Sequence, residues 1–504
     1  MDDKPTAGLR DLFEAVHGDE DDAVVRLLRA GAPAEATDED GTTVLYQAAA
    51  HDRPGAVRLL LAAGADPDRP GGPSGGDLPL CAAAVGGHTE VARALLAAGA
   101  RPDLREDLGF TALAWAAGRG RAATAEVLLA HGADPDLPGP GGEPPLVLAA
   151  RRGSPATVRA LLRHRATARE AALEEARRWL EKDVEPAVRE GLERTYGARD
   201  GDEFVAREVT EEGGTTVLVE LLRDGRPVAR EEQQSGHAAV VTRLECVLGV
   251  GTPAEVLAQR AVRSGMPEGN DWRESVAVLW QRADAHTLRA AGAWCAESSP
   301  DLLQTFAADV LARAAQAADA VPLLRGLARR EGPSALTRAA IRALGRHADA
   351  SGLPEVLRHA GHRDAGIRER VAVALGRFGP YEEAGSSAVS ALLTLAGDDE
   401  LRVRREAITA LARAGGNTER VRDALAEQVE ERAPDPLSPT DPAYAEAARA
   451  LAVRGDARAV DALLRVLVDD RPDGAARRIA RDAVRHVPDE RARLRLEWTP
   501  ARLH

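Results

Sequence analysis

Apolar positions in the first third of the chain repeat with a period of about 33 residues. Each copy ends as an apolar helix that runs into a glycine, in the segments VVRLLRAGA, VRLLLAAGA, ARALLAAGA and AEVLLAHGA. These glycines are Gly31, Gly64, Gly99 and Gly132, and Arg165 takes the same position in the next copy. A unit of this length cannot bury its apolar face alone, so the pattern predicts stacked two-helix repeats.

The order inside each copy is also regular. A turn leads to a short apolar helix around Leu45, Leu80, Leu113 and Leu146, and a second helix then runs to the glycine. Glycine suits the left-handed position that follows a helix. Asp-Pro-Asp after the second helix supplies the turn that stops it.

This pattern resembles the ankyrin repeat, in which a T-P-L-H segment begins the first helix. The matching positions are Thr43 and Thr111, Pro79 and Pro145, and the four leucines, whereas Tyr46, Cys81, Ala114 and Val147 stand in the histidine position. The resemblance implies about five ankyrin repeats over residues 8–166, both caps included, with weaker hydrogen bonding at some helix starts.

In ankyrin proteins the hairpin tips and the residues flanking the first helix form the binding face. Carried over by position, the resemblance implies a protein-binding face of Glu39, Asp40, Thr42, Asp77, Asp107, Phe110, Arg119, Glu143, Arg151 and Arg152. Phe110 is the most informative member because aromatic residues make up 3% of the chain and dominate interface energetics. The alternative is that Phe110 packs on the next hairpin, and we expect Trp115 in the core.

Residues 167–235 have a different pattern. Alternating charges around apolar positions predict a helical linker, and three β-rich segments between Glu203 and Glu232 predict a small meander. The meander is a spacer between two arrays, a strand-addition site or a small regulatory element. Residues 236–284 are a helical lead-in, in which we assign His237 a structural role. We expect a cut near residues 199–202 to separate two independent arrays.

A second array of alanine-rich helices is expected over residues 285–490, followed by a C-terminal tail at 491–504. Its copies align on Leu311, Leu344, Leu375, Leu411, Leu451 and Val484, with a proline-rich loop at 433–442. The array resembles short bacterial HEAT repeats. The signature consists of Asp364, Ile367, Arg368, Val371, Ala372, Leu375 and Gly376, and it recurs at Asp399, Val403, Arg404, Ala407 and Leu411.

The resemblance to HEAT repeats leaves two roles open for these charges. Asp364, Arg368, Asp399 and Arg404 are expected to bridge neighbouring repeats as a structural ladder. The alternative is a basic groove made of Arg338, Arg342, Arg368, Arg404, Arg477 and Arg478.

Composition narrows the classes of function. Acidic residues outnumber basic ones by 80 to 66, which gives a net charge of -14 and makes nucleic acid an unfavoured partner. Almost all the basic residues are arginines. A GC-rich genome favours arginine over lysine, so clusters of arginine are weak evidence for nucleic-acid binding. No apolar run has bilayer length, and MDDKPTAGLRDLFEA is not a secretory signal, so we expect a cytoplasmic protein without membrane contact.

No catalytic motif was found. Cys81, Cys246 and Cys295 lack metal-ligand spacing, and no phosphate loop or nucleophile motif occurs. The expected fold is mainly α, with two helical solenoids joined by a helix and a three-stranded meander, and the combination resembles repeat proteins of actinobacteria. We expect a non-enzymatic protein-interaction adaptor without metal or cofactor. The alternatives are a solenoid enzyme or nucleic-acid-binding protein that uses the basic groove, or an immunity or inhibitor protein.

Overall fold

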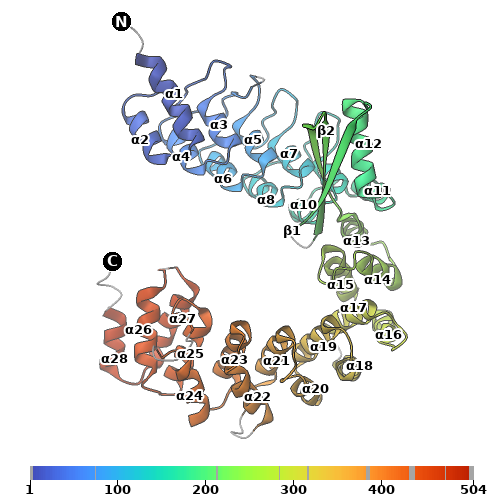
Figure 1. Ribbon diagram of the computed structural model, residues 1–504, viewed down its shortest axis with the longest axis vertical. Helices are drawn as coiled ribbons and strands as arrows, with labels where there is room; N and C mark the ends of the chain where they lie inside the picture. The colour runs from blue at the N-terminus through green and yellow to red at the C-terminus, as the bar shows by residue number, and fades with distance from the viewer. Residues whose placement is uncertain are drawn as a thin grey trace. The chain divides into compact units, whose positions relative to one another are not determined.

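The computed structural model describes residues 4–73, 75–211, 214–282, 284–314, 317–381, 386–430, 437–471 and 473–498, with side chains omitted at 4–9, 211 and 317. The chain forms two compact units, Met1–Val278 and Leu279–His504 (Figure 1). The fold class predicted from the sequence is confirmed. The cut expected at 199–202 falls within the first unit, and the proline-rich loop at 433–442 lies partly outside the described residues.

The first unit begins with paired helices in two layers. Helices α3, α5, α7 and α9 pack side by side, and α4, α6, α8 and α10 form the second layer. The bounds are α1 (Lys4–His17), α2 (Asp21–Arg29), α3 (Val44–Ala50), α4 (Pro54–Ala62), α5 (Pro79–Gly86), α6 (Thr89–Ala97), α7 (Ala112–Gly118), α8 (Ala122–Ala130), α9 (Pro145–Arg152) and α10 (Pro155–Arg163).

Residues identified in the sequence begin these helices. Thr43 and Thr111 are N-caps whose hydroxyl oxygens accept hydrogen bonds from the amides of Tyr46 (3.1 Å) and Ala114 (3.2 Å). Pro79 is the first residue of α5, where the missing amide proton has no cost. A single hydrophobic core then continues through every repeat, from Leu12 to Leu244.

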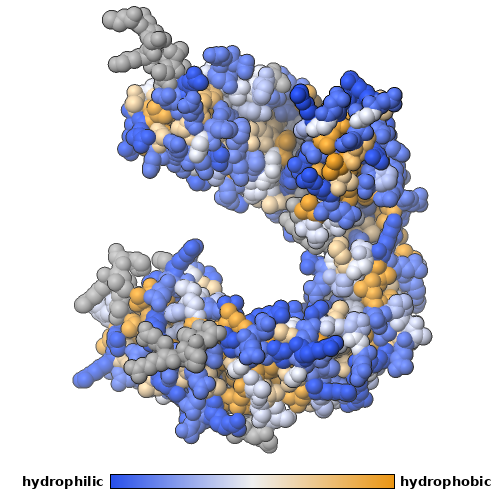
Figure 2. All heavy atoms as spheres, in the orientation of Figure 1, coloured by the Kyte–Doolittle hydropathy of each residue, from blue (hydrophilic) through white to orange (hydrophobic). Residues whose placement is uncertain are grey.

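The predicted linker and meander complete the first unit. Its elements are α11 (Arg169–Leu180), α12 (Val184–Tyr196), β1 (Asp202–Glu211), β2 (Gly214–Arg223), β3 (Arg226–Gln234), α13 (His237–Val247), α14 (Ala254–Arg263) and α15 (Asn270–Arg282), the last of which continues into the second unit. The strands form an antiparallel sheet in the order β1-β2-β3. Val217, Val219 and Leu221 of β2 pack on Val188 and Leu192 of α12, where Figure 2 shows apolar residues gathered.

The second unit is also built from two layers of helices. Helices α17, α19, α21, α23, α25 and α27 pack in sequence as one layer. The bounds are α16 (Ala285–Trp294), α17 (Asp301–Leu311), α18 (Ala317–Arg329), α19 (Ser334–His347), η1 (Ala350–Gly352), α20 (Leu353–Arg358), α21 (Ala365–Phe378), α22 (Ser387–Ala396), α23 (Leu401–Ala414), α24 (Glu419–Glu427), α25 (Pro442–Val453), α26 (Ala459–Asp469), α27 (Ala475–Ala483), η2 (Val484–His486) and α28 (Glu490–Trp498).

Small residues let the helices of this layer approach closely. A Cβ atom at Gly345 would lie 2.6 Å from the Cβ of Ala374, and one at Gly376 would lie 2.9 Å from that of Ala410. Any larger side chain at either glycine would force two neighbouring repeats apart. Helix α28 packs on α26, in the segment where a tail was expected.

We predict that a fragment of residues 1–282 folds, whereas a fragment of residues 1–199 melts about 10 °C lower. The shorter fragment loses Val240, Val241 and Leu244, which are fully buried in the shared core. Burial of each such side chain contributes about 1.5–3 kcal/mol, and each lost kcal/mol lowers the Tm of a domain of this size by about 2–4 °C. Thermal melts followed by circular dichroism test this, and equal melting temperatures would contradict it.

Candidate functional site

The basic residues of the predicted binding face contact strand β3 of the same unit. Arg119 lies 3.6 Å from a carboxylate oxygen of Glu231. Arg121 and Arg152 lie 3.8 Å and 3.3 Å from the carboxylate of Glu232. Two adjacent glutamates of the meander therefore neutralise arginines at the carboxyl ends of α7 and α9.

Backbone contacts fix the same junction. The Gln233 side-chain amide donates to the carbonyl of Arg151 at 2.7 Å, and the amide of Gly236 donates to the carbonyl of Gly153 at 3.2 Å. Gly153 has a φ of +68°, and a Cβ atom there would collide with the Gln234 carbonyl. The glycine that ends α9 is thus also needed for the approach of β3.

Arg152 is the most enclosed of these arginines, with 5% of its surface exposed. Burial lowers the pKa of Arg152 to about 10, which leaves its guanidinium charged at neutral pH. Its contact with Glu232 compensates for part of the lost hydration.

Arg151 and Glu143 of the predicted face are also paired with each other. The Arg151 guanidinium donates to Glu143 at 2.8 Å and, from Nε, to Glu175 of α11 at 2.8 Å. The hydrogen bond from Arg151 lowers the pKa of the Glu143 carboxyl. Four predicted face residues, Arg119, Glu143, Arg151 and Arg152, therefore contact groups of their own unit.

The other predicted face residues lie in the hairpins that precede α3, α5 and α7. Glu39, Asp40 and Asp107 are exposed, and Thr42, Asp77 and Phe110 are half-buried. The Asp107 carboxylate lies over the backbone of Gly76, where any Cβ atom would overlap it. The second and third hairpins thus place acidic groups next to each other.

Phe110 and Trp115 form an aromatic pair in the third hairpin and α7. Their ring centroids are 4.3 Å apart, and the Trp115 indole donates to Glu106 at 2.5 Å. Phe110 also lies close to Gly139 of the next hairpin. This contact agrees with the alternative, given in the sequence analysis, that Phe110 packs on the next hairpin. Trp115 is half-buried against the core instead of enclosed by it.

Three contributors to this surface were missed from the sequence. Leu108 is 61% exposed at the tip of the third hairpin, buried Glu106 accepts the hydrogen bond from Trp115, and Arg121 joins the contact with β3. The apolar periodicity does not extend into the hairpins, so it could not identify Leu108. The one feature of the sequence that could have identified Leu108 as a surface residue is its position in a hairpin that also contains acidic residues.

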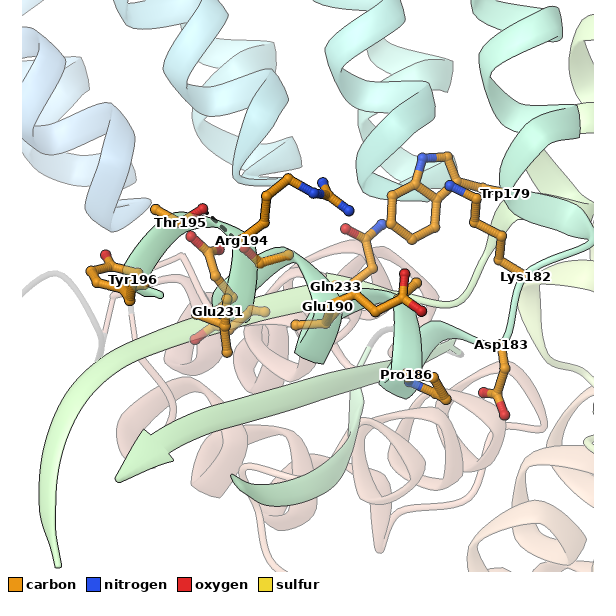
Figure 3. Close-up of a pocket in the computed structure, with 15 residues that line it drawn as sticks. Trp179, Lys182, Asp183, Pro186, Glu190, Arg194, Thr195, Tyr196, Glu231 and Gln233 are labelled. Carbon is orange, nitrogen blue, oxygen red and sulfur yellow. Dashed lines mark hydrogen bonds between the residues drawn. The ribbon is translucent and has the colours of Figure 1, made fainter. Parts of the chain in front are cut away.

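A hollow of about 520 Å³ lies between α11, α12 and β3 (Figure 3). Trp179, Lys182, Arg194 and Glu190 are among its lining residues. The Lys182 ammonium lies 4.8 Å from the centre of the Trp179 ring. Its walls carry charges of both signs, so they do not select a ligand by charge.

His237 is enclosed beside this hollow. Its ring stacks on Trp179 with centroids 5.3 Å apart, and its Nε2 lies 3.0 Å from the carbonyl oxygen of Arg151. Burial lowers the pKa of His237 to about 4. These contacts join α13 to the ankyrin repeats, which agrees with the structural role that we assigned to His237.

In the second unit, several arginines of the predicted groove contact nearby carbonyl groups. Arg368 donates to the carbonyls of His362 (2.9 Å) and Arg363 (3.2 Å). Arg404 repeats this with Asp398 and Asp399, and buried Arg477 donates to the carbonyl of Asp470. Each arginine fastens the start of its helix to the preceding loop.

Ion pairs join successive repeats. Arg368 holds both carboxylate oxygens of Asp398, at 2.6 Å and 2.8 Å, and Arg342 lies 2.6 Å from Asp309. Asp364 caps α21 and also lies 3.6 Å from Arg338 of α19, in the preceding repeat. Of the groove candidates, Arg478 is exposed.

Within the described ranges, no group of histidine, cysteine and acidic side chains could hold a metal ion. None of the helices in the described part of the chain is long and apolar enough to cross a membrane.

Comparison with protein families agrees with both arrays. Residues 12–106 and 80–172 match a model of ankyrin repeats, and residues 362–438 match a model of HEAT repeats. The chain carries ankyrin and HEAT repeats. No curated protein matches the chain. Both repeat families are typical protein-interaction scaffolds and are generally not enzymes.

We predict that Arg368→Ala destabilises the HEAT repeats by about 3 kcal/mol, because it leaves Asp398 enclosed without its cation. Adding Asp398→Ala should restore about 1 kcal/mol. Arg402→Ala is the matched control, since Arg402 is exposed and lies 3.9 Å from Glu369, and should cost less than about 1 kcal/mol. Denaturant unfolding of the full chain gives these values, and a double variant no more stable than Arg368→Ala would contradict the pairing.

We predict that His237 makes the ankyrin unit sensitive to acid. Because its folded pKa of about 4 lies below the ordinary value of 6.5, the unfolded chain binds the proton first as the pH falls. Stability is therefore complete above pH 6.5 and is lost as the pH falls toward 4. Between pH 7 and pH 5, His237→Gln should lose about 2 kcal/mol less stability than the native chain. Denaturant unfolding at both pH values measures this, and equal losses would exclude His237 as the cause.

Proposed function

We propose that the chain is a non-enzymatic adaptor that binds a protein partner through its ankyrin hairpins. The contact is centred on the hairpin surface, which we define as Asp40, Asp77, Asp107, Leu108 and Phe110. The exposed Leu108 beside the Phe110–Trp115 pair supports this most directly. Apolar and aromatic side chains surrounded by polar ones are the usual centre of a protein interface.

The HEAT repeats would hold a second partner. The arginines of the predicted basic groove favour this over nucleic-acid binding, because Arg342, Arg368, Arg404 and Arg477 already bond to their own unit. A polyanion site needs cations that are free to meet phosphates. We place the adaptor in the cytoplasm, which its three free cysteines support.

We predict that Leu108→Ser weakens partner binding by about 1–2 kcal/mol without changing the melting temperature, because Leu108 is exposed. Phe110→Ala should weaken binding and also lower the melting temperature, since Phe110 packs on Trp115. Calorimetric titration of each full-length variant with a partner recovered by the native chain measures the affinity.

The matched control is Val453→Ser, which removes an apolar side chain that is 52% exposed on the HEAT unit. This variant should bind like the native chain. Unchanged affinity of both hairpin variants would exclude the hairpin surface as the binding site.

A further inference from the structure

We propose that the HEAT unit binds an acidic segment of a protein partner at a site made of Trp280, Arg313 and Arg346, which we call the arginine–tryptophan site. The inference rests on the proposed function, because it specifies the chemistry of the adaptor's second partner. It follows from two exposed arginines of successive repeats that share one aromatic ring and make no ion pair among the described residues.

The site is built from three helices of the second unit. Trp280 lies in the part of α15 that belongs to this unit, Arg313 lies two residues after α17, and Arg346 lies in the last turn of α19. The guanidinium of Arg313 lies over the centre of the Trp280 ring, and that of Arg346 lies 5.9 Å from it. Because the face of an aromatic ring attracts cations, the indole holds both guanidinium groups at one place.

The carboxylate next to the site is already bound by another arginine. Asp309 lies one helical turn before Arg313, and the guanidinium of Arg342 lies 2.6 Å from it. Arg342 in turn lies one turn before Arg346 on α19. Residues four apart lie on the same face of a helix. Three arginines therefore lie on adjacent turns with one carboxylate, which leaves an excess of positive charge.

The other acidic side chains close to the site in sequence do not remove this excess. Asp284 caps α16 through the amide of Thr287 (2.7 Å), and Asp349 accepts hydrogen bonds from the amide (2.9 Å) and hydroxyl (2.6 Å) of Ser351. Asp319 of α18 is exposed and makes no ion pair among the described contacts. The two arginines on the Trp280 ring thus keep their charge available to a ligand.

Donor groups prevail at the site, and acceptors are scarce. The indole Nε1 of Trp280 is enclosed and has no acceptor among the described residues. Burial lowers the pKa of Arg313 and Arg346 lowers it further, whereas Asp309 acts against both. Arg282, two residues after Trp280, is another basic residue. A ligand with carboxylate groups would supply acceptors that planar guanidinium groups can bind with two hydrogen bonds each.

The surroundings of the site favour an acidic protein segment over a nucleic acid. Carboxylates interrupt the basic residues of this helix layer, since Asp309 binds Arg342 and Asp398 binds Arg368. A nucleic-acid strand gains its affinity from many phosphate contacts, and the net charge of -14 opposes its approach. A short run of glutamate or aspartate needs only a local pair of guanidinium groups.

The experiment measures the binding of labelled probes to the full chain by fluorescence anisotropy, at low and physiological salt. One probe is a peptide with four consecutive glutamates, the second has glutamine in their place, and the third is a single-stranded DNA oligonucleotide. The test variant is Arg313→Gln with Arg346→Gln. The control is Arg358→Gln with Arg363→Gln, which removes the same charge from exposed positions of the same unit.

We expect the glutamate peptide to bind the native chain and the control alike, and the test variant about tenfold more weakly, because two charged donors are lost. The difference should shrink at higher salt. Arg346→Gln alone leaves Arg313 on the Trp280 ring and should weaken binding about threefold. This single variant tests the site even if the double variant melts at a lower temperature.

Three results would overturn the inference. Equal binding by the test and control variants would show that the peptide responds to the overall charge of the unit. Equal binding of the glutamate and glutamine peptides, or a lack of saturable binding, would exclude an acidic segment as the ligand. Binding of the oligonucleotide that is tighter than that of the glutamate peptide and is lost in the test variant would assign the site to nucleic acid.

The proposed function fails separately from this inference. Leu108→Ser and Phe110→Ala change the ankyrin hairpins only, so both variants should bind the glutamate peptide like the native chain. The proposed function fails when these two variants leave the affinity for the native partner unchanged, whatever the glutamate peptide does.

Discussion

Both units depend on the same constraint, which is that no repeat can bury its own apolar face. In the ankyrin unit one core runs from Leu12 to Leu244, so each helix pair completes the core of the next. In the HEAT unit the helices also approach closely, because Gly345 and Gly376 meet the alanines of the following helix. A stack of this kind ends in an unpaired face that needs a cover.

The meander and the helices around it provide that cover for the ankyrin repeats. Helices α11 and α13 continue the core. Strand β3 brings Glu231 and Glu232 to Arg119 and Arg152 at the ends of α7 and α9. Enclosing Arg152 is costly unless a carboxylate accompanies it. Strand β3 therefore stabilises the ankyrin repeats. Its glutamates neutralise the arginines at the ends of α7 and α9, whereas the hairpins before α3, α5 and α7 carry the acidic and apolar residues of the face.

The sequence predicts the features that recur from repeat to repeat, such as helix starts. It does not predict contacts between residues that are far apart in the chain and have no repeating pattern. Thr43 and Thr111 were identified as helix starts because the same position begins the first helix of each repeat, where threonine caps α3 and α7 and proline begins α5 and α9. The contact of Arg152 with Glu232 joins positions 80 residues apart without any repeating signal. By position alone, Arg152 therefore resembled a partner-binding residue. Similarly, the motif identified Arg368 as structural but did not identify Asp398 as the residue that binds it.

Arginine carries little information about partners in this chain, because so many of its guanidinium groups are part of the fold. Arg454, for example, donates to carbonyls of Leu411, Ala412 and Gly416, a task that suits a planar group with five donors. Acidic residues exceed basic ones by 80 to 66. The number of arginines in the sequence therefore does not by itself indicate a basic binding surface, because Arg368, Arg404, Arg454 and Arg477 are held by contacts within their own unit.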